Sequence, residues 1–330
     1  MTSTLDKAGV GGLPAENLGK KIAAEVIAAL EAGQLELPTL PDMAIRIRES
    51  LENPEISVEK LVHILSTDPV VTVHIIRAAN NSSLYNGSKV DNLRDAVSRL
   101  GYRLLYSIVM NVTLAELFQA KDLSIDRALR RLWQHSREVA AHCYVLAKKR
   151  DHLNPEVALL TGLVHDIGAL PLYLSADRLR LHPDQVTLEG LIQEHAAAIS
   201  PRLLQSWNFP DSLVSIVSAH KNPRFAISPD LADYVDVLTM ANLQMEESTK
   251  PVTWRNISAA ERLYFYPGDC RIFFSSHAEQ IAAVKGMLGI NAELPAKATD
   301  ADETLPLTSH QPFQQSGFIN SLSRLFRQQQ

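Results

Sequence analysis

The chain has 330 residues, of which 46% are hydrophobic and 21% are charged, and its formal net charge is −5. This length is enough for one large domain or two ordinary ones with a sizeable core. The mildly acidic balance argues against a general attraction to nucleic acid or to anionic membranes. The two cysteines, Cys143 and Cys270, are too few for a disulfide framework or a cysteine zinc site, which fits a reducing compartment.

The beginning of the chain shows no basic start followed by an apolar run, so no signal peptide is expected. Residues 1–17 are predicted to be a flexible N-terminus. No stretch approaches the roughly 18 consecutive apolar residues that a spanning helix needs. We therefore expect a cytoplasmic protein without a transmembrane segment.

Apolar residues recur at helical spacing through residues 18–120, with no convincing strand among them. Ser57 is predicted to cap one helix, and Asp68 followed by Pro69 combines an N-cap side chain with proline at the first helical position. Gly101 is expected to separate two further helices. The predicted helices are 18–33, 42–52, 57–65, 68–79, 93–100 and 104–118. Together they form an expected N-terminal lobe.

The same periodicity predicts a second helical lobe over residues 121–292. Ser200 followed by Pro201 is expected to interrupt one of its helices, because proline lacks the N–H that continues the helix. The predicted helices are 126–148, 155–166, 189–207, 211–220, 231–245, 254–260 and 278–288. Residues 293–330 are predicted to be a polar linker and a short amphipathic helix, which would dock on this chain, a partner or a membrane.

The segment Gly-Leu-Val-His-Asp-Ile-Gly at 162–168 is the most informative part of the chain. It places His165 and Asp166 side by side at the end of an apolar helical segment, and Gly168 is expected to stop that helix. An imidazole and a carboxylate can share one divalent metal ion. The pair therefore predicts half of a metal site.

Other histidines recur on otherwise apolar helices. His135 lies in the middle of a predicted helix, His195 follows Glu194, and His220 ends the helix that begins near residue 211. Taken singly, each is more typical of a satisfied core or surface histidine than of a ligand. Their recurrence indicates a shared polar pocket.

These features together resemble the HDOD family of bacterial signalling proteins, within the HD phosphohydrolase superfamily. The resemblance extends over about residues 20–245. The segments that carry it are 37–41, 66–69, 77–82, 96–101, 132–136, 162–168, 203–207 and 219–223. It implies an all-α fold of two helical lobes, the second built like an HD phosphohydrolase.

An active HD phosphohydrolase holds one or two metal ions with a His, a His-Asp pair and a distant Asp. The resemblance places His135, His165 and Asp166 at the first three positions and Asn242 at or near the last. Asp236, on the same predicted helix, is the candidate substitute for the missing carboxylate. The resemblance implies a divalent ion (Mg, Mn, Fe or Zn) bound with weakened affinity, because the amide of Asn242 in place of a carboxylate removes one negative charge from the site.

The cyclic-dinucleotide phosphodiesterase branch of this superfamily has paired histidines and a Gly-Tyr-Pro motif, and this chain has neither. Lys221 stands at the second histidine position, where its ammonium would oppose a second cation. Arg130, Arg131 and Lys221 are candidate phosphate-binding residues. A solvent-exposed helix face is the alternative interpretation of the two arginines.

The resemblance favours a non-catalytic signal-transduction protein that contacts signalling partners. Its HD-like pocket would be degenerate and would sense a nucleotide or second messenger, with no specific nucleic-acid partner. The alternative is a metal-dependent phosphohydrolase acting on a nucleotide or another phosphoester. A third hypothesis is a structural module that keeps the His-Asp pair only through hydrogen bonds.

Overall fold

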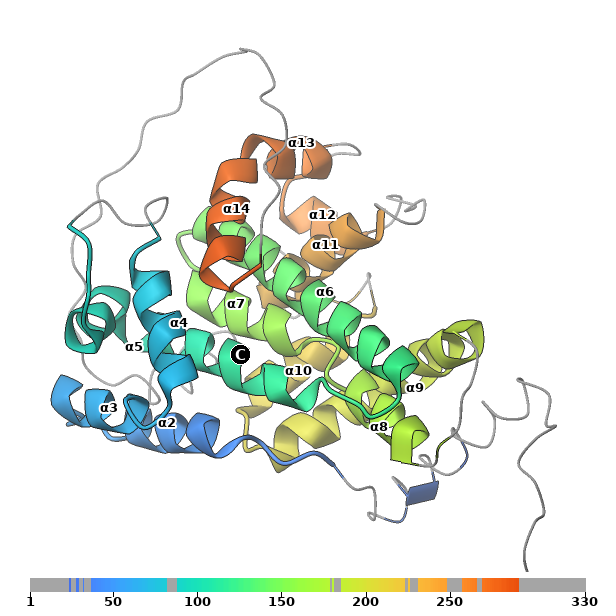
Figure 1. The fold of residues 1–330 in the computed structure, drawn as a ribbon. Coiled ribbons are helices and arrows are strands. Elements are labelled where there is room, and N and C mark those ends of the chain that lie inside the picture. Colours follow the sequence, from blue (N-terminus) through green and yellow to red (C-terminus); the bar gives the residue numbers. More distant parts are fainter. Residues whose placement is uncertain are drawn as a thin grey trace, which may run out of the picture.

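The computed structural model is built of helices, and no strand occurs among the residues that it describes (Figure 1). It describes residues 24, 28, 29, 32, 37–81, 88–178, 180, 185–222, 225, 231–247, 257–265 and 269–290. The expected all-α class is therefore confirmed for this part of the chain. The predicted helix at 18–33 falls largely outside the described residues, and the predicted linker and amphipathic helix at 293–330 fall entirely outside them.

Among the described residues, the N-terminal lobe contains four α-helices and a short 3₁₀ turn that follows them. They are α2 (Asp42–Glu52), α3 (Val58–Leu65), α4 (Pro69–Ala79), α5 (Leu93–Leu114) and η1 (Ala115–Leu117). In the second lobe the described part of the chain forms nine helices. They are α6 (Leu123–Lys148), α7 (Pro155–Val164), α8 (Ala169–Arg178), α9 (Gln185–Ser206), α10 (Asp211–Ala219), α11 (Tyr234–Glu247), α12 (Ser258–Arg262), α13 (Asp269–Ser276) and α14 (Ala278–Met287).

Helix starts follow the predicted capping chemistry closely. The Ser57 hydroxyl accepts from the Lys60 N–H at 3.2 Å, and the Asp68 carboxylate accepts from two N–H groups in the first turn of α4. The predicted start of α6 at Asp126 was wrong. The helix begins three residues earlier, at Leu123, with Asp122 as its N-cap, while Asp126 pairs with Arg130 on the helix surface at 2.7 Å.

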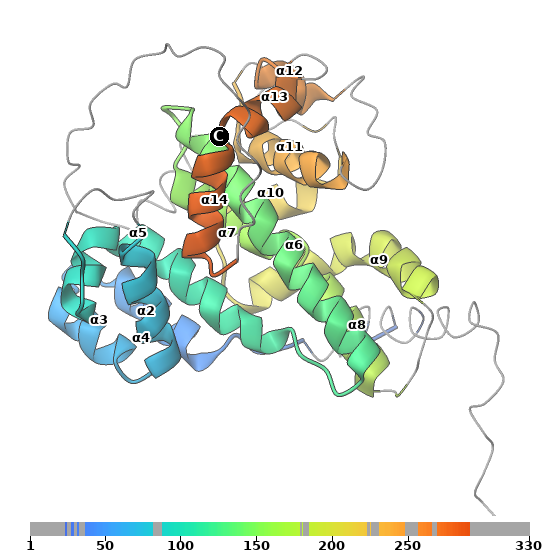
Figure 2. The ribbon, with the colours of Figure 1, turned by 45° about the horizontal axis from the view of Figure 1, so that its top comes forward.

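Helix α5 connects the two lobes. Gly101 interrupts it with a φ of 71°, so the predicted break is confirmed as a kink between two helical halves. The N-terminal part of the chain gathers on one side of the molecule in Figures 1 and 2, and α5 runs from there toward α7. The lobes also meet where the Trp207 indole N–H donates to the Pro38 carbonyl at 2.8 Å and the Asn81 amide donates to the Ala283 carbonyl.

The second lobe is organised around the contact between α6 and α7, which is the most extensive between any two of the described helices. Gly162 of α7 lies against Ala140 of α6, and a Cβ added at Gly162 would stand only 2.5 Å from the Ala140 Cα. The two backbones approach this closely because neither residue has a side chain larger than a methyl group. The contact sets the distance between the histidine of α6 and the His-Asp pair that follows α7.

Gly168 has a role that the sequence prediction did not give it. It lies just before α8, a helix that was not predicted, and a Cβ there would lie 2.1 Å from the Ala196 carbonyl oxygen of α9. The Gly168 N–H also donates to the Ser200 hydroxyl at 3.0 Å. Gly168 is thus required for close packing of the chain against α9.

Helix α9 continues through Pro201, so the predicted interruption was wrong. The Ser200 hydroxyl donates to the Ala196 carbonyl at 3.1 Å and accepts from Gly168, which provides hydrogen bonds beside the position where proline lacks its N–H. Helix α13 was not predicted either. Helix α12 begins at Ser258, inside the segment expected to be helical at 254–260, whose first three residues lie outside the described part of the chain.

One described stretch is long and apolar enough to cross a membrane by composition, although none was expected. It comprises α7 and α8, from Pro155 to Arg178, and 89% of its most apolar window is buried inside the fold. These residues form the core around the His-Asp pair. Burial in the core of the fold accounts for their apolar character.

Gly162→Ala is expected to lower the free energy of unfolding by about 1–3 kcal/mol or more, because the added methyl meets backbone atoms that cannot move alone. Gly190→Ala is the matched control, since a Cβ at Gly190 meets nothing within 4 Å and alanine favours a helix by about 1 kcal/mol. Urea unfolding followed by circular dichroism measures both. Equal stabilities of the two variants would contradict the proposed close approach.

Candidate metal centre

Three of the predicted ligands come together at the junction of α6 and α7. His135 lies on α6, and His165 and Asp166 follow the last residue of α7. One ligand atom from each of these three side chains lies within 4.8 Å of the others, which is the spacing of a metal-binding group. Asn154 caps α7 and Pro155 occupies its first position, so local sequence fixes where this helix begins.

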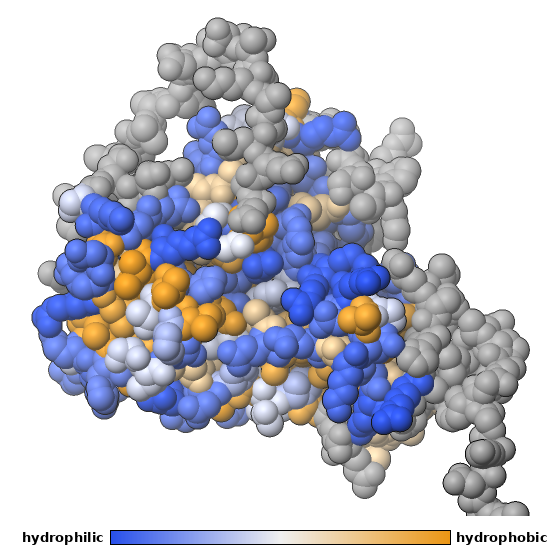
Figure 3. Space-filling view, in the orientation of Figure 1, coloured by the Kyte–Doolittle hydropathy of each residue, from blue (hydrophilic) through white to orange (hydrophobic). Residues whose placement is uncertain are grey.

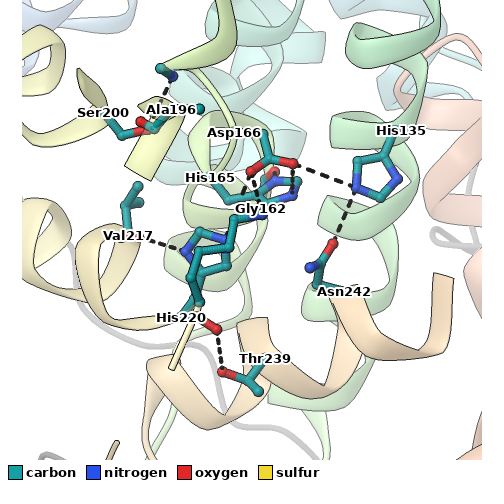
Figure 4. A network of polar contacts seen from close by, with 12 residues as sticks. His135, Gly162, His165, Asp166, Ala196, Ser200, Val217, His220, Thr239 and Asn242 are labelled. Atoms are coloured by element: carbon teal, nitrogen blue, oxygen red, sulfur yellow. Dashed lines mark hydrogen bonds and ion pairs between the residues drawn. The ribbon is translucent and has the colours of Figure 1, made fainter. Parts of the chain in front are cut away.

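Asp166 lies at the centre of the group (Figure 4). Its Oδ2 atom is 3.2 Å from the Nε2 of His165 and 3.9 Å from the Nε2 of His135. Its Oδ1 atom is 3.9 Å from the Nε2 of His220. The predicted association of His220 with the pocket therefore matches its position, at the end of α10.

Backbone carbonyls orient two of these rings. The Nδ1 of His165 donates to the Gly162 carbonyl at 2.8 Å, and the Nδ1 of His220 donates to the Val217 carbonyl at 2.5 Å. With the proton on Nδ1, each Nε2 carries a lone pair. Both Nε2 atoms are buried and make no hydrogen bond. A buried nitrogen with a free lone pair is the donor that a transition metal needs.

The protein environment keeps two of the imidazoles neutral. Burial, together with the neighbouring His165 ring, lowers the pKa of His135 to about 4. Burial, with the positive charge of Lys221 next to it, lowers the pKa of His220 to about 3. Both rings are therefore uncharged at neutral pH, the state in which an imidazole ligates a metal.

Lys221 forms the strongest contact to Asp166, with its Nζ 2.8 Å from Oδ1. Burial alone would raise the pKa of Asp166, but the adjacent His165 and the Lys221 ammonium outweigh it and hold that pKa well below the usual value. Burial would lower the pKa of Lys221, and the Asp166 charge raises it instead. The two groups thus form an ion pair, and the structure brings Lys221 into the pocket.

Asn242 faces the pocket from α11, where the resemblance implies a carboxylate. Its Oδ1 lies 3.1 Å from the Nε2 of His135, and its Nδ2 donates to Glu246 at 3.0 Å. Since the amide nitrogen is engaged by a carboxylate, the amide oxygen must face His135, and His135 must be the donor. This tautomer places the proton of His135 on the nitrogen that points into the pocket.

Asp236 does not complete the centre, contrary to its predicted role as a substitute carboxylate. It is fully buried and forms a bidentate ion pair with Arg262, with one oxygen 2.9 Å from the arginine Nε. It also forms a capping box with Asp233, in which each side chain accepts from the N–H of the other residue. The Asp236 carboxylate therefore caps the first turn of α11 and binds Arg262 of α12.

The other predicted site residues lie apart from this group. His195 is 3.7 Å from Glu194, its neighbour in sequence, and contacts neither Asp166 nor His135 among the interactions of the described residues. Arg130 is exposed and pairs with Asp126, as the solvated-face interpretation expects. Arg131 is also exposed, one helical turn before His135. The structure therefore brings only Lys221 of the three phosphate-binding candidates against Asp166.

The donor set fits a single divalent ion of the transition series. Two imidazoles and one carboxylate suit Zn²⁺, Fe²⁺ or Mn²⁺, whereas Mg²⁺ prefers oxygen ligands and several carboxylates. His135, His165 and Asp166 are the residues that would hold it. The fit is imperfect, because the pocket-facing nitrogen of His135 is the hydrogen-bond donor to Asn242.

The fold and this site define an all-α protein with an HD-type pocket. The model of the HDOD domain matches residues 37–223, more than half of the chain. The protein belongs to the HDOD family.

Solved structures share the fold. A protein of Shewanella amazonensis SB2B, provisionally named a metal-dependent phosphohydrolase, is 23% identical with a TM-score of 0.69, covering 82% of this chain and 99% of that one. An HDOD domain protein of unknown function from Geobacter sulfurreducens is 21% identical with a TM-score of 0.60, covering 83% and 98%. A provisionally named signal transduction protein from Marinobacter aquaeolei VT8 is 21% identical with a TM-score of 0.56, covering 84% and 66%.

A curated relative matches at lower coverage. This is an uncharacterized protein of Treponema pallidum (strain Nichols), 22% identical over an alignment of 213 residues that covers 61% of this chain and 40% of the relative. The match thus spans about two fifths of that protein's length.

Arg262→Ala is expected to lower the free energy of unfolding by about 3–5 kcal/mol, because it leaves the buried Asp236 charge without its partner. Arg94→Ala is the matched control. Its ion pair with Glu59 is exposed, so its loss costs less than about 1 kcal/mol. Chemical denaturation measures both, and a similar small effect for the two variants would show that Asp236 is free to serve another role.

Proposed function

We propose that this protein is a regulatory HDOD module of a signalling system and that its HD-type pocket does not hydrolyse phosphoesters. The observation that carries the proposal is Asn242 at the closing position. Its oxygen accepts from the Nε2 of His135 at 3.1 Å, and its nitrogen is held by Glu246. An ion bound here would have to break the hydrogen bond between His135 and Asn242. It would also find an uncharged amide where the resemblance implies a carboxylate.

The charge balance of the pocket supports the same conclusion. Asp166 is the carboxylate of the three-residue group, and Lys221 neutralises it at 2.8 Å. A divalent ion next to a neutral set of side chains lacks the electrostatic attraction that hard cations require. Weak metal affinity is the expected consequence, and a hydrolase that depends on a metal-activated water would lose its nucleophile.

A regulatory module needs surfaces for partners. Helix α4 exposes Val70 and Val73, with 60% and 63% of each residue accessible, and Figure 3 shows apolar side chains gathered on the N-terminal side of the molecule. Large exposed apolar side chains on one helix face suit contact with a protein partner. The proposal thus assigns partner contacts to the N-terminal lobe, residues 18–120, and ligand sensing to the lobe at 121–292, in a cytoplasmic protein.

The ligand of the pocket is proposed to be a nucleotide or second messenger. Lys221, whose side chain is 42% exposed, stands at the rim and offers an ammonium to an incoming phosphate. The name of the Marinobacter protein, a signal transduction protein, is consistent with a sensing role for this chain.

Metal-dependent phosphohydrolysis is the second candidate. It is favoured by the buried, unpartnered Nε2 atoms of His165 and His220. A bound metal supplies a hydroxide by lowering the pKa of a coordinated water. His135, His165 and Asp166 would hold it, and Lys221 would orient a phosphate. The Shewanella relative named as a phosphohydrolase is consistent with this alternative.

The 330-residue chain is expected to show no turnover of phosphomonoesters, phosphodiesters or cyclic dinucleotides above the background of His165→Ala, with Mn²⁺, Fe²⁺ or Mg²⁺ added. Hydrolysis followed by chromatography of the products measures this. Turnover by the wild type that is lost in His165→Ala would overturn the regulatory proposal in favour of the phosphohydrolase.

Asn242→Asp is expected to increase Mn²⁺ affinity by about tenfold or more, which corresponds to about 1.4 kcal/mol. The reason is that a carboxylate adds a negative charge and an oxygen ligand beside His135. Asn53→Asp is the matched control, because it makes the same change at an exposed position that ends α2. Calorimetric titration measures both, and equal affinities would contradict the assignment of Asn242 as the closing position.

A further inference from the structure

Asp166 presents its two carboxylate oxygens to two different groups of side chains. Oδ2 faces His165 and His135, at 3.2 Å and 3.9 Å. Oδ1 faces Lys221 and His220, at 2.8 Å and 3.9 Å. A bridging carboxylate of this kind divides the pocket into two halves, each with one oxygen and at least one imidazole nitrogen.

The half on the Oδ1 side has the donors that a cation needs. The Nε2 of His220 is buried, makes no hydrogen bond and carries a lone pair, since its Nδ1 donates to the Val217 carbonyl. The ring of His220 lies 5.4 Å from that of His165, centroid to centroid. A nitrogen and a carboxylate oxygen thus converge on one position beside the half formed by His135 and His165.

That half already contains a positive charge. The Lys221 ammonium contacts Oδ1 directly, and Glu246 is the other acidic group that acts on it. Its backbone position is fixed, because Lys221 follows His220 at the end of α10, and the next residue, Asn222, donates its N–H to the Ala219 carbonyl at 2.9 Å. The His220 carbonyl in turn accepts from Thr239 of α11.

We propose that Lys221 is a tethered cation that takes the place of a second metal ion, so that the pocket accommodates no more than one divalent ion. The inference rests on the proposed function in one respect, which is that His135, His165 and Asp166 form the ion-binding half. An ammonium and a divalent ion that share one carboxylate oxygen repel each other strongly at such distances. A second ion is therefore excluded for as long as Lys221 keeps its charge.

The positive charge of Lys221 also weakens the binding of the first ion, in the half formed by His135 and His165. The Lys221 ammonium offsets the negative charge of Asp166, so an ion in the other half meets a carboxylate whose attraction is already partly cancelled. Removal of the ammonium should strengthen binding there, and an imidazole in its place should create a second binding position. These two effects distinguish a tethered cation from a lysine that only stabilises the fold.

The experiment is a Mn²⁺ titration of the 330-residue chain by calorimetry, with the bound metal counted by elemental analysis after gel filtration. We expect at most one equivalent in the wild type and in Lys221→Arg, which keeps the charge. We expect Lys221→Gln to bind the first ion about tenfold more tightly. We expect Lys221→His to bind one equivalent more than the wild type.

Lys149→Gln is the matched control, because it removes the same charge from an exposed position at the far end of α6, roughly four helical turns from His135. It should behave like the wild type. Thermal unfolding of each variant establishes that it is folded, and Lys221→Gln and Lys221→His test the inference independently of each other.

Two equivalents in the wild type would overturn the inference. So would Lys221→Gln and Lys221→His variants that match Lys149→Gln in both affinity and stoichiometry, including the case in which none of them binds Mn²⁺. This last result would leave the regulatory proposal standing. Conversely, one bound ion together with phosphoester turnover would remove the regulatory proposal and leave the role of Lys221 intact.

Discussion

The candidate site depends on one close contact between two helices. Gly162 and Ala140 let the backbones of α7 and α6 approach until a single added methyl group would collide with the Ala140 Cα at 2.5 Å. This contact sets the separation of His135 from the His-Asp pair, and the Gly162 carbonyl also fixes the ring of His165. A second approach, at Gly168 against α9, holds the other side of the pair. The geometry of the pocket therefore depends on the close packing of these small residues.

The electrostatics of the pocket depend on the Asp166 carboxylate, which several side chains contact at once. Asp166 is contacted by imidazoles and by the ammonium of Lys221, and its charge is balanced inside the protein. Asn242 adds an oxygen without a charge and fixes the His135 tautomer that points a proton into the pocket. Asn242 and Lys221 are the two side chains on which the proposed weak metal binding and the proposed absence of hydrolysis depend.

Local sequence predicted most helices of the described chain, because their limits are set by neighbouring residues. Ser57 and Asp68 cap helices with their own side chains, and Gly101 kinks α5 through its own backbone conformation. The start of α6 was misplaced although its N-cap, Asp122, is local. Other predictions that were wrong involved distant partners. Helix α9 passes through Pro201, and Gly168 is followed directly by α8, because contacts between α8 and α9 shape both segments. Asp236 looked available in the sequence, yet Arg262, 26 residues later, pairs with it.

The sequence by itself determined the all-α class, the positions of most helices and the order of His135, the His-Asp pair and His220, since these depend on short-range periodicity and on residue identity. The tertiary structure decided which of those groups meet. It brought Lys221 and Asn242 to Asp166 and His135, and it placed Asp236 and His195 elsewhere. The physical reason is that a charge in a folded protein is satisfied by whichever partner packing brings within a few ångströms, and sequence spacing does not encode that distance.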